Sequence, residues 1–362
     1  MPRRNPVPVF DGHNDTLLRL TLKTPEKEDA FFTGGEEGHI DLPRAKAGGL
    51  AGGLFAVFVP TPGWQKEVLW REEGPKGPRK NKGWDVPLAG RVSQGRALNA
   101  VLSMAATLFR LEKRSRGQLR VIRTHRQLLS AMDKGALAAV LHMEGVEALK
   151  KDLDALPVLH EAGLRSLGPV WSRPNAFGHG VPFNFPDSPD IGPGLSAAGK
   201  DLVRLCNELR ILVDLSHLNA KGFWDVSAIS RAPLVASHCG AHALCPSPRN
   251  LTDDQLEAIR DSGGIVGVNF ARSFLRRDGL GDRRTSLTEI VRHVEYIAEK
   301  IGVDHVGFGS DFDGTVVPQD LKDAAGLPRL IDALRGRGIK GQALAKVAHG
   351  NWLRVLKQTW GK

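Results

Sequence analysis

Short apolar runs alternate with helix-like segments along almost the whole chain, and this alternation restricts the fold more than any other feature. Apolar runs of about four to eight residues are typical of buried strands, and strands that alternate with helices build a parallel sheet. Eight such runs are present, at residues 7–15, 50–59, 137–144, 165–171, 211–217, 234–238, 264–270 and 305–311. Eight strand–helix units predict a (β/α)8 barrel of the TIM type.

Helix signals separate these runs. Thr124 opens a helix, with Gln127 at the capping-box position. Further segments with helical character lie at residues 94–114, 152–162, 197–209, 252–262 and 286–301. We find neither an internal repeat nor a linker that would divide the chain, so we expect residues 1–362 to form one domain.

A long segment rich in Pro, Gly and Lys, residues 60–90, leaves the end of the second predicted strand. Loops of this length are usually functional or disordered, so we predict a lid over the mouth of the barrel. We expect its tryptophans, Trp64, Trp70 and Trp84, to pack the lid on the barrel. The alternative is that they line a substrate pocket.

The net charge of +10 raises the question of nucleic-acid binding. A dense group of basic residues lies at 66–82, but Glu67, Glu72 and Glu73 are interspersed with it. The sequence contains no helix-turn-helix, zinc-finger or RNP-like signature. We therefore expect a solvated basic loop and no nucleic-acid partner, although a basic field could attract anionic substrates.

The sequence shows no sign of secretion or of a membrane anchor. The N-terminal residues MPRRNPVPVF lack the apolar region of a signal peptide, and the apolar stretch at 48–59 is Gly-rich and too short to span a bilayer. The three cysteines, Cys206, Cys239 and Cys245, make no disulfide framework. We therefore expect a cytoplasmic protein that does not associate with membranes.

Metal-binding residue types stand at the C-terminal ends of several predicted strands. His13 and Asp15 lie two apart in extended chain, so both side chains point to the same side. The other strand ends add Glu144, His217, His238 and Asp311. This set exceeds the needs of one zinc ion but fits two ions roughly 3.5–4 Å apart that share a carboxylate and a bridging hydroxide nucleophile. Glu144 is the expected bridge and Asp311 the expected proton carrier.

Six motifs resemble, in order, those of the renal (membrane) dipeptidase family: DGHND at 11–15, HMEG at 142–145, DLSH at 214–217, SHCGAH at 237–242, PRN at 248–250 and GSDFDG at 309–314. The closing residues HGNWLRVL, 349–356, are similar to the last helix of that family. Its members are zinc peptidases on an amidohydrolase-type barrel. The resemblance therefore implies the same fold as the strand pattern does.

The resemblance also implies a set of ligands. His13 and Asp15 would hold one zinc ion, His217 and His238 the other, and Glu144 would bridge the two. Asp311 would act as general acid and base, and Arg249 would bind the C-terminal carboxylate of the substrate. A guanidinium suits that role because its planar fork pairs with a carboxylate through two parallel hydrogen bonds.

One position departs from the family. Where mammalian members carry a histidine that contacts the substrate carbonyl, this chain has Trp171, whose indole N–H can donate a single hydrogen bond. Either the metal ions alone stabilise the oxyanion, or His179 or Arg173 from the following loop takes part. Substrate preference is therefore open.

The function implied is that of a zinc-dependent dipeptidase, acting on small dipeptides through a metal-bridging hydroxide. Some family members accept a C-terminal D-residue or open β-lactams, and the family often forms homodimers. The alternative is a binuclear metal amidohydrolase that acts on another amide, an N-acyl amino acid or a lactone. A barrel that has lost catalysis and serves as a binding protein is disfavoured by the intact donor set.

Several polar residues near the motifs have structural explanations. His142 is expected to be a buried, hydrogen-bonded core residue, and Cys239 a packed thiol. Asp214 is expected to face away from His217 and to serve a supporting role. Asp313 shares a face with Asp311, so spacing alone does not separate their roles. The other histidines expected at surface or structural positions are His160, His242, His293, His305 and His349.

Overall fold

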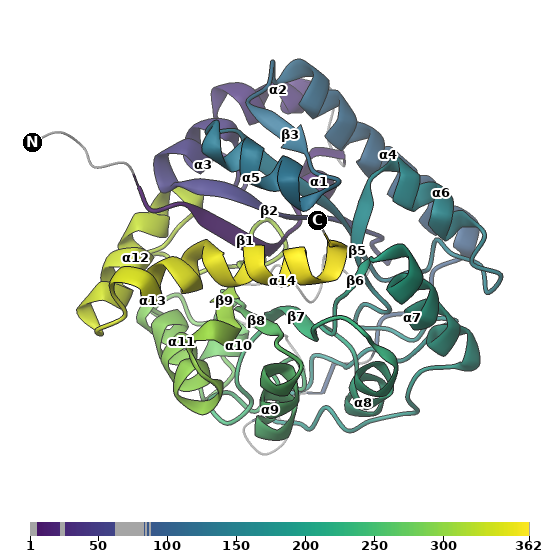
Figure 1. Cartoon of the computed structure of the whole chain (residues 1–362). Helices are drawn as coiled ribbons and strands as arrows, with labels where there is room; N and C mark the ends of the chain where they lie inside the picture. Colours follow the sequence, from purple (N-terminus) through teal and green to yellow (C-terminus); the bar gives the residue numbers. More distant parts are fainter. Residues whose placement is uncertain (1–5, 22–25, 62–82, 84, 87, 362) are drawn as a thin grey trace, which may run out of the picture.

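The computed structural model describes residues 6–21, 26–61, 83, 85–86 and 88–361. In this part of the chain, nine parallel strands form one curled sheet in the order β6-β5-β4-β2-β1-β9-β8-β7, with β3 paired to β4 (Figure 1). The strands are β1 Val9–Asn14, β2 Leu50–Phe58, β3 Leu119–Val121, β4 Leu137–Glu144, β5 Leu164–Gly168, β6 Leu212–Val213, β7 Val235–Cys239, β8 Ile265–Val268 and β9 Val306–Phe308. Each of the eight predicted strands is found.

The sheet closes between β6 and β7. Asp214 and Val235 form a parallel bridge, and Leu215 N donates to Val235 O at 2.8 Å. The predicted (β/α)8 barrel is therefore confirmed. The additional strand β3 was not predicted, because three residues are too few to give a periodic signal. Strand β3 pairs with the first residues of β4, and β5 pairs with the later residues of β4 along the same edge.

The strand predicted at residues 211–217 is much shorter in the structure, because β6 keeps only Leu212–Val213. Beyond it the backbone turns, and His217 has a positive φ of 68°. The Asp214 carboxylate accepts hydrogen bonds from the backbone amides of Ser216 (3.0 Å) and Ser237 (2.7 Å). A side chain thus satisfies amides that the short β6–β7 ladder leaves unpaired.

Helices cover the outside of the barrel (Figure 1). They are α1 Thr16–Thr21, α2 Glu26–Thr33, α3 Leu42–Gly48, α4 Gln94–Arg114, α5 His125–Asp133, α6 Ala155–Ala162, α7 Ala197–Leu209, α8 Ala220–Ile229, α9 Asp253–Asp261, α10 Arg272–Leu275, α11 Thr288–Ile301, α12 Leu327–Gly336, α13 Gly341–Ala345 and α14 Asn351–Trp360. The bounds of α4 and α7 are those predicted. At α5, Thr124 accepts from Gln127 N as predicted, whereas Gln127 Oε1 accepts from Arg123 N.

The last helix, α14, seals the N-terminal end of the barrel and crosses the centre of Figure 1. The indole of Trp352 donates to Phe308 O at 2.9 Å, and its ring centroid lies 5.9 Å from that of Phe10. Gly12 fits beneath this ring, because a Cβ there would lie 2.4 Å from a carbon of Trp352. With this end packed, the polar strand ends face the opposite, C-terminal mouth.

Most of the predicted lid, including Trp64, Trp70 and Trp84, lies outside the described residues. At its base, Thr61 Oγ1 donates to Gly90 O at 3.3 Å. Among the helices in the described part of the chain, none combines the length and apolar character that a bilayer crossing requires.

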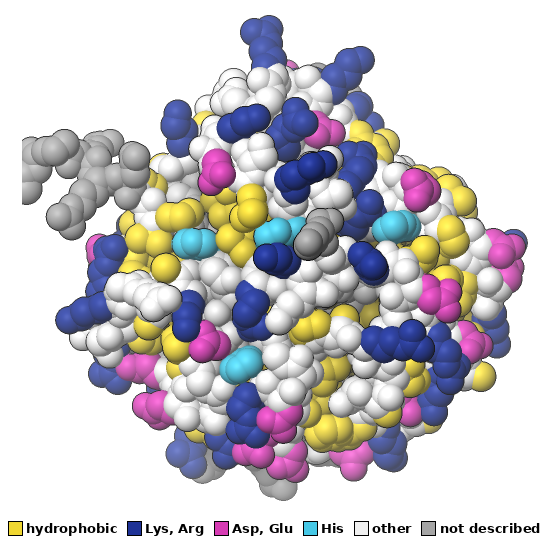
Figure 2. Space-filling model, in the orientation of Figure 1, with side chains coloured by type: hydrophobic (Ala, Val, Ile, Leu, Met, Phe, Trp, Pro, Cys, Tyr) yellow, Lys and Arg dark blue, Asp and Glu magenta, His cyan; other side chains and the backbone are white. Residues whose placement is uncertain are grey.

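Charged side chains of both signs cover the face in Figure 2, with Lys and Arg gathered over its upper part, near α4, β3 and α5. Residues 110–126 contain seven Lys or Arg residues and one acidic residue. They are therefore more basic than residues 66–82, which contain six Lys or Arg residues and three acidic residues. Arg110 and Arg114 pair with Glu28, so part of this charge is neutralised within the chain. The expected absence of a nucleic-acid partner stays a prediction.

Candidate metal centre

Three imidazoles converge on one carboxylate oxygen at the C-terminal mouth. Glu144 Oε1, at the end of β4, lies 2.9 Å from His217 Nε2, 3.5 Å from His238 Nε2 and 3.7 Å from His13 Nε2. The Nε2 atoms of His217 and His238 are 3.0 Å apart. Two ligands of a tetrahedral zinc ion with bonds of 2.0–2.1 Å stand about 3.3 Å apart. These separations therefore suit a metal ion held between the donors.

The end of β1 supplies the second part of the centre. His13 and Asp15 are both buried, and His13 Nε2 lies 3.5 Å from Asp15 Oδ2. Donor atoms of these two residues and of Asp311 lie within 4.8 Å of one another. The structure thus brings all six residues predicted from the strand ends to one mouth.

Asp311 is placed by its backbone and by one neighbour. Its φ is +57°, in the left-handed region, and Asn269 Nδ2 donates to Asp311 Oδ2 at 3.1 Å. The next turn must pass close to the carboxylates: a Cβ at Gly314 would lie 2.1 Å from Asp15 Oδ2 and 2.3 Å from Asp311 Oδ1. A side chain at position 314 would displace these two carboxylates, and neither Gly314 nor Asn269 could be assigned a role from the sequence.

The structure separates Asp311 from Asp313. The Asp313 carboxylate lies 3.1 Å from Arg19 Nε and accepts from His39 N (2.6 Å) and Thr16 Oγ1 (3.0 Å). These contacts leave it no part in the donor group. Two side chains that are two residues apart share a face only where the chain is extended. Asp311 and Asp313 both have a positive φ, so the rule does not apply to them.

Burial and like charges shift the pKa values in the centre. Burial raises the pKa of Glu144 well above its usual range, and Asp15 and Asp311 raise it further. Burial also raises the pKa of Asp311 to about 6. Burial acts to lower the pKa of His13, but the neighbouring carboxylates, Glu144 first, raise it to about 10. The carboxylates thus need a positive charge among them, and a divalent ion would supply it.

The two other imidazoles behave in the opposite way. Burial, together with Arg249 and His13, lowers the pKa values of His217 and His238 well below the usual range. Both rings are therefore neutral at ordinary pH, as a metal ligand must be. The Nδ1 atoms of the two rings contact serine hydroxyls, Ser172 Oγ at 2.7 Å and Ser237 Oγ at 2.8 Å. This leaves Nε2 of each ring facing Glu144.

Unpartnered buried atoms support a fit to metal ions. Both ring nitrogens of His13 and Oδ1 of Asp15 are buried and have no hydrogen-bond partner in the part of the chain that the structure describes. Such atoms are rare in folded proteins and costly unless a ligand completes them. Two donor groups, Glu144–His217–His238 and His13–Asp15–Asp311, are each compact enough to surround an ion.

Arg249 lies at the edge of the centre and is buried. Its Nη2 donates to His238 O at 3.2 Å, and its Cζ lies 5.6 Å from the Phe274 ring centroid. Its Nε is buried and has no hydrogen-bond partner among the described residues. Trp171 lies close by, with its ring centroid 5.7 Å from that of His217 and 4.8 Å from that of Phe58. Both residues are therefore beside the donor group, as the sequence predicted.

The two loop residues considered beside Trp171 differ in position. Arg173 is fully buried next to the indole, with Cζ 5.2 Å from the ring centroid, and donates to Glu147 (2.8 Å) and Thr61 (2.9 Å). His179 accepts from Asn219 N through its carbonyl oxygen. Among the described residues, no hydrogen bond or ion pair joins His179 to the donor group.

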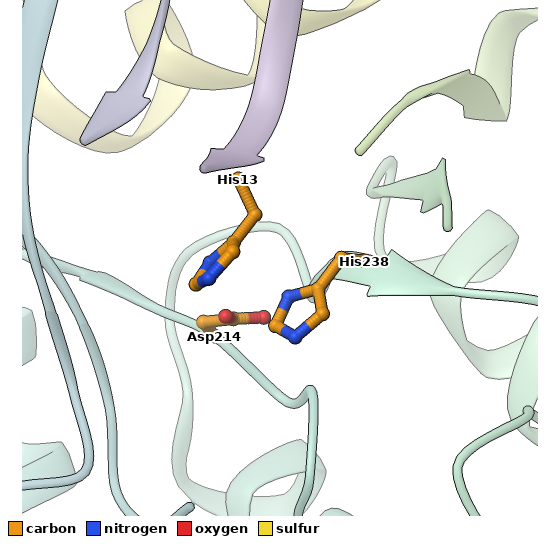
Figure 3. A group of neighbouring side chains, drawn as sticks. All are labelled: His13, Asp214 and His238. Atoms are coloured by element: carbon orange, nitrogen blue, oxygen red, sulfur yellow. The ribbon is translucent and has the colours of Figure 1, made fainter. Parts of the chain in front are cut away.

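The remaining polar residues occupy structural places. His142 is fully buried beside Ser166 Oγ (2.9 Å from Nδ1), and burial lowers its pKa to about 3, as expected for a core residue. Cys239 is buried as predicted. Asp214, expected to face away, instead lies inside the barrel, beside the stacked rings of His13 and His238 (Figure 3).

Comparison with known proteins agrees with this arrangement. A family model described as Membrane dipeptidase (Peptidase family M19) matches residues 4–360. A metallo peptidase from Rhodobacter sphaeroides, solved with a phosphinate mimic of the dipeptide L-Ala-D-Ala, has a TM-score of 0.93 and 47% identity, over 98% of this chain and 100% of that one.

Sequence relatives extend the comparison. An uncharacterized Klebsiella pneumoniae protein of the pqqA 5′ region is 48% identical over 266 residues, which is 74% of this chain and 98% of that protein. The dipeptidase aclJ of Aspergillus oryzae is 29% identical over 360 residues, covering 97% of this chain and 78% of aclJ. On the family match, the chain belongs to the membrane dipeptidase family, a family of metallo-dipeptidases.

Proposed function

We propose that this protein is a zinc-dependent dipeptidase with two zinc ions per chain, bridged by Glu144. The observation that carries the proposal is the approach of His13, His217 and His238 Nε2 to a single oxygen of Glu144, within 3.7 Å. His13 and Asp15 would hold one ion and His217 and His238 the other. When bound, the ions supply Lewis acidity that polarises the scissile carbonyl and activates water.

Asp311 is the residue proposed to move the proton. Asn269 holds Oδ2, which leaves Oδ1 directed toward Asp15 and the donor group. Burial raises the pKa of Asp311 to about 6, toward the neutral range in which a general acid and base exchanges protons readily. It would take a proton from the attacking water and give it to the leaving amine.

Arg249 is proposed to bind the free carboxylate of the dipeptide. Its position beside His238, and an Nε with no partner among the described residues, support this role, because a fixed cation there could pair with an anionic group. The aromatic rings of Trp171, Phe183 and Phe274 stand beside His217 and Arg249. They would favour small or apolar substrate side chains, and Trp171 would line the substrate pocket. Among the described residues, no hydrogen bond or ion pair supports a contribution from His179.

The Rhodobacter structure with a mimic of L-Ala-D-Ala supports a C-terminal D-residue as an accepted substrate feature. We further propose a cytoplasmic, single-domain protein; a homodimer is implied only by the resemblance to the family. Because Trp171 departs from the family pattern, a second function is a candidate: that of a binuclear metal amidohydrolase acting on another amide, an N-acyl amino acid or a lactone.

The test combines zinc content with hydrolysis of L-Ala-L-Ala, L-Ala-D-Ala, N-acetyl-D-Ala and the dipeptide amide. The proposal predicts two zinc ions per chain and chelator-sensitive cleavage of the free dipeptides alone. Cleavage of N-acetyl-D-Ala but of neither dipeptide would favour the second candidate. Dipeptide cleavage that survives complete removal of metal would contradict the zinc mechanism.

A further inference from the structure

Asp214 is buried next to the metal centre, beside the stacked rings of His13 and His238 (Figure 3). One oxygen of Asp214 and one nitrogen of each histidine lie within 4.8 Å of one another, a spacing that would also suit a metal ion. Asp214 could therefore be a ligand, or it could act on the ligands around it. Its hydrogen bonds decide between the two roles.

Both oxygens of the Asp214 carboxylate are already occupied. Oδ1 accepts from the backbone amides of Ser216 (3.0 Å) and Ser237 (2.7 Å), and Oδ2 accepts from Ser237 Oγ at 2.5 Å. The side chain is fully buried, so no water competes for these bonds. A carboxylate with this many donors is satisfied without an ion.

The bond to Ser237 fixes the direction of the next one. A serine hydroxyl has one proton, and Ser237 Oγ donates it to Asp214 Oδ2. Ser237 Oγ also lies 2.8 Å from His238 Nδ1 and must accept there. The proton of neutral His238 is therefore on Nδ1, and the lone pair of Nε2 faces Glu144 and His217.

We propose that Asp214, acting through Ser237, is a positioning residue that fixes the tautomer of His238 for metal binding. This inference rests on the proposed zinc site. Without the relay, His238 could carry its proton on Nε2 and donate it to His217 Nε2, only 3.0 Å away. That hydrogen bond would close the space between the two rings to a cation.

The chain contains a matched control for this arrangement. Asp11, also buried, accepts from Ser310 N at 2.6 Å and from Ser310 Oγ at 2.8 Å, as Asp214 does from Ser237. Ser310 Oγ donates to the carbonyl oxygen of His13 and, among the described residues, contacts no imidazole nitrogen. Ser310→Ala thus removes the same hydroxyl from a buried carboxylate without disturbing a ring tautomer.

Asp214→Asn reverses the relay with almost no change of shape. The two backbone amides at Oδ1 require the amide oxygen of asparagine there, which places the NH2 group against Ser237 Oγ. Ser237 would then accept from Asn and donate to His238 Nδ1. The proton of His238 would move to Nε2, the atom that should bind the metal.

The experiment has two readouts on wild type, Asp214→Asn, Ser237→Ala and Ser310→Ala, each checked for folding by circular dichroism. The first is the tautomer of His238 in the metal-free protein, from ¹⁵N-histidine NMR assigned with His238→Gln. The second is the zinc dissociation constant, from competition with a chelator. We expect Nδ1–H in wild type and Nε2–H in Asp214→Asn.

The zinc dissociation constant should rise about 10- to 100-fold in Ser237→Ala and further in Asp214→Asn. Ser310→Ala should keep the wild-type constant. A proton on Nε2 of His238 in the wild type would overturn the inference. Unchanged zinc binding in Ser237→Ala would also overturn it. If Asp214→Asn then lost zinc binding strongly while Ser237→Ala did not, Asp214 would be a metal ligand. If the wild type binds no zinc, the zinc proposal fails, while the tautomer in the metal-free protein still tests the relay.

Discussion

The backbone amide of Asp311 donates a hydrogen bond to the carbonyl oxygen of His13 at 3.0 Å. This bond continues the pairing of β9 with β1 beyond its single residue pair, Asp11 with Phe308. It joins the last strand of the barrel to the first at the metal centre. The left-handed backbone of Asp311 costs about 1–3 kcal/mol, which is consistent with a functional demand on its position.

Asp311→Asn should lower kcat while metal binding persists. The amide keeps the shape of the side chain but cannot accept the proton, and loss of a general acid–base group costs about 10²–10⁴-fold in rate. Zinc content and KM should change little. The measurement is steady-state kinetics on L-Ala-D-Ala with metal analysis of the same sample.

Asp313→Asn is the control for this variant. It breaks the pair with Arg19, whose mostly buried cation would lose its charged partner, at a cost of up to about 3–5 kcal/mol in the free energy of unfolding. Its kcat should stay near that of the wild type. A larger loss of kcat in Asp313→Asn than in Asp311→Asn would reverse the roles assigned to the two residues.

Glu144→Gln should remove metal from the centre. The neutral amide loses the charge shared by both ions and turns an NH2 group toward one of the donor sites. We expect a loss in kcat/KM of at least about 10³-fold, equivalent to roughly 4 kcal/mol, and fewer than two zinc ions per chain. Glu147→Gln, which alters a buried carboxylate bound to Arg173, should retain the metal. Full zinc loading of Glu144→Gln would argue against the bridge.

Arg249→Ala should weaken the enzyme only toward substrates with a free carboxylate. Truncating one partner of a buried charge pair costs about 2–5 kcal/mol, so kcat/KM for a dipeptide should fall at least about 30-fold. Arg249→Lys should recover part of this loss, because it restores the charge without the planar fork. An equal loss on the dipeptide amide would show that Arg249 acts on the fold, through its bond to His238 O, and not on the substrate.

His293 should make the fold sensitive to acid. Burial lowers its pKa to about 4, and its neutral ring accepts from Ala241 N at 3.0 Å and donates to Leu275 O at 2.9 Å. The unfolded chain binds this proton near pH 6.5, so stability is complete above that pH and falls as the pH drops toward 4, by about 3 kcal/mol. Urea unfolding of the wild type and of His293→Gln, each at pH 7 and pH 4.5, measures this loss in the free energy of unfolding. An equal pH dependence in both proteins would contradict the assignment.

The sequence predicted the barrel and its mouth because buried parallel strands leave a strong apolar signal. The carboxyl ends of parallel strands meet at one edge, so His13, Glu144, His217 and His238 could be grouped without coordinates. The same rule worked for strands as short as β9, because the residues that follow them are chemically distinctive.

The rule failed where the backbone leaves the extended conformation. Asp214 and His217, three residues apart, would point to opposite sides of a strand, but β6 ends at Val213 and His217 has a positive φ. The relay through Ser237 could not be foreseen for the same reason. It depends on a turn at the barrel seam and on a contact between two strands.

The most direct test of the bridging role of Glu144 is an anomalous difference map, collected at the zinc absorption edge, from crystals of the zinc-loaded protein. The account predicts two peaks, one between His13 and Asp15, the other between His217 and His238, each about 2.0–2.2 Å from an oxygen of Glu144. A single peak, or two peaks that do not share Glu144, would contradict it.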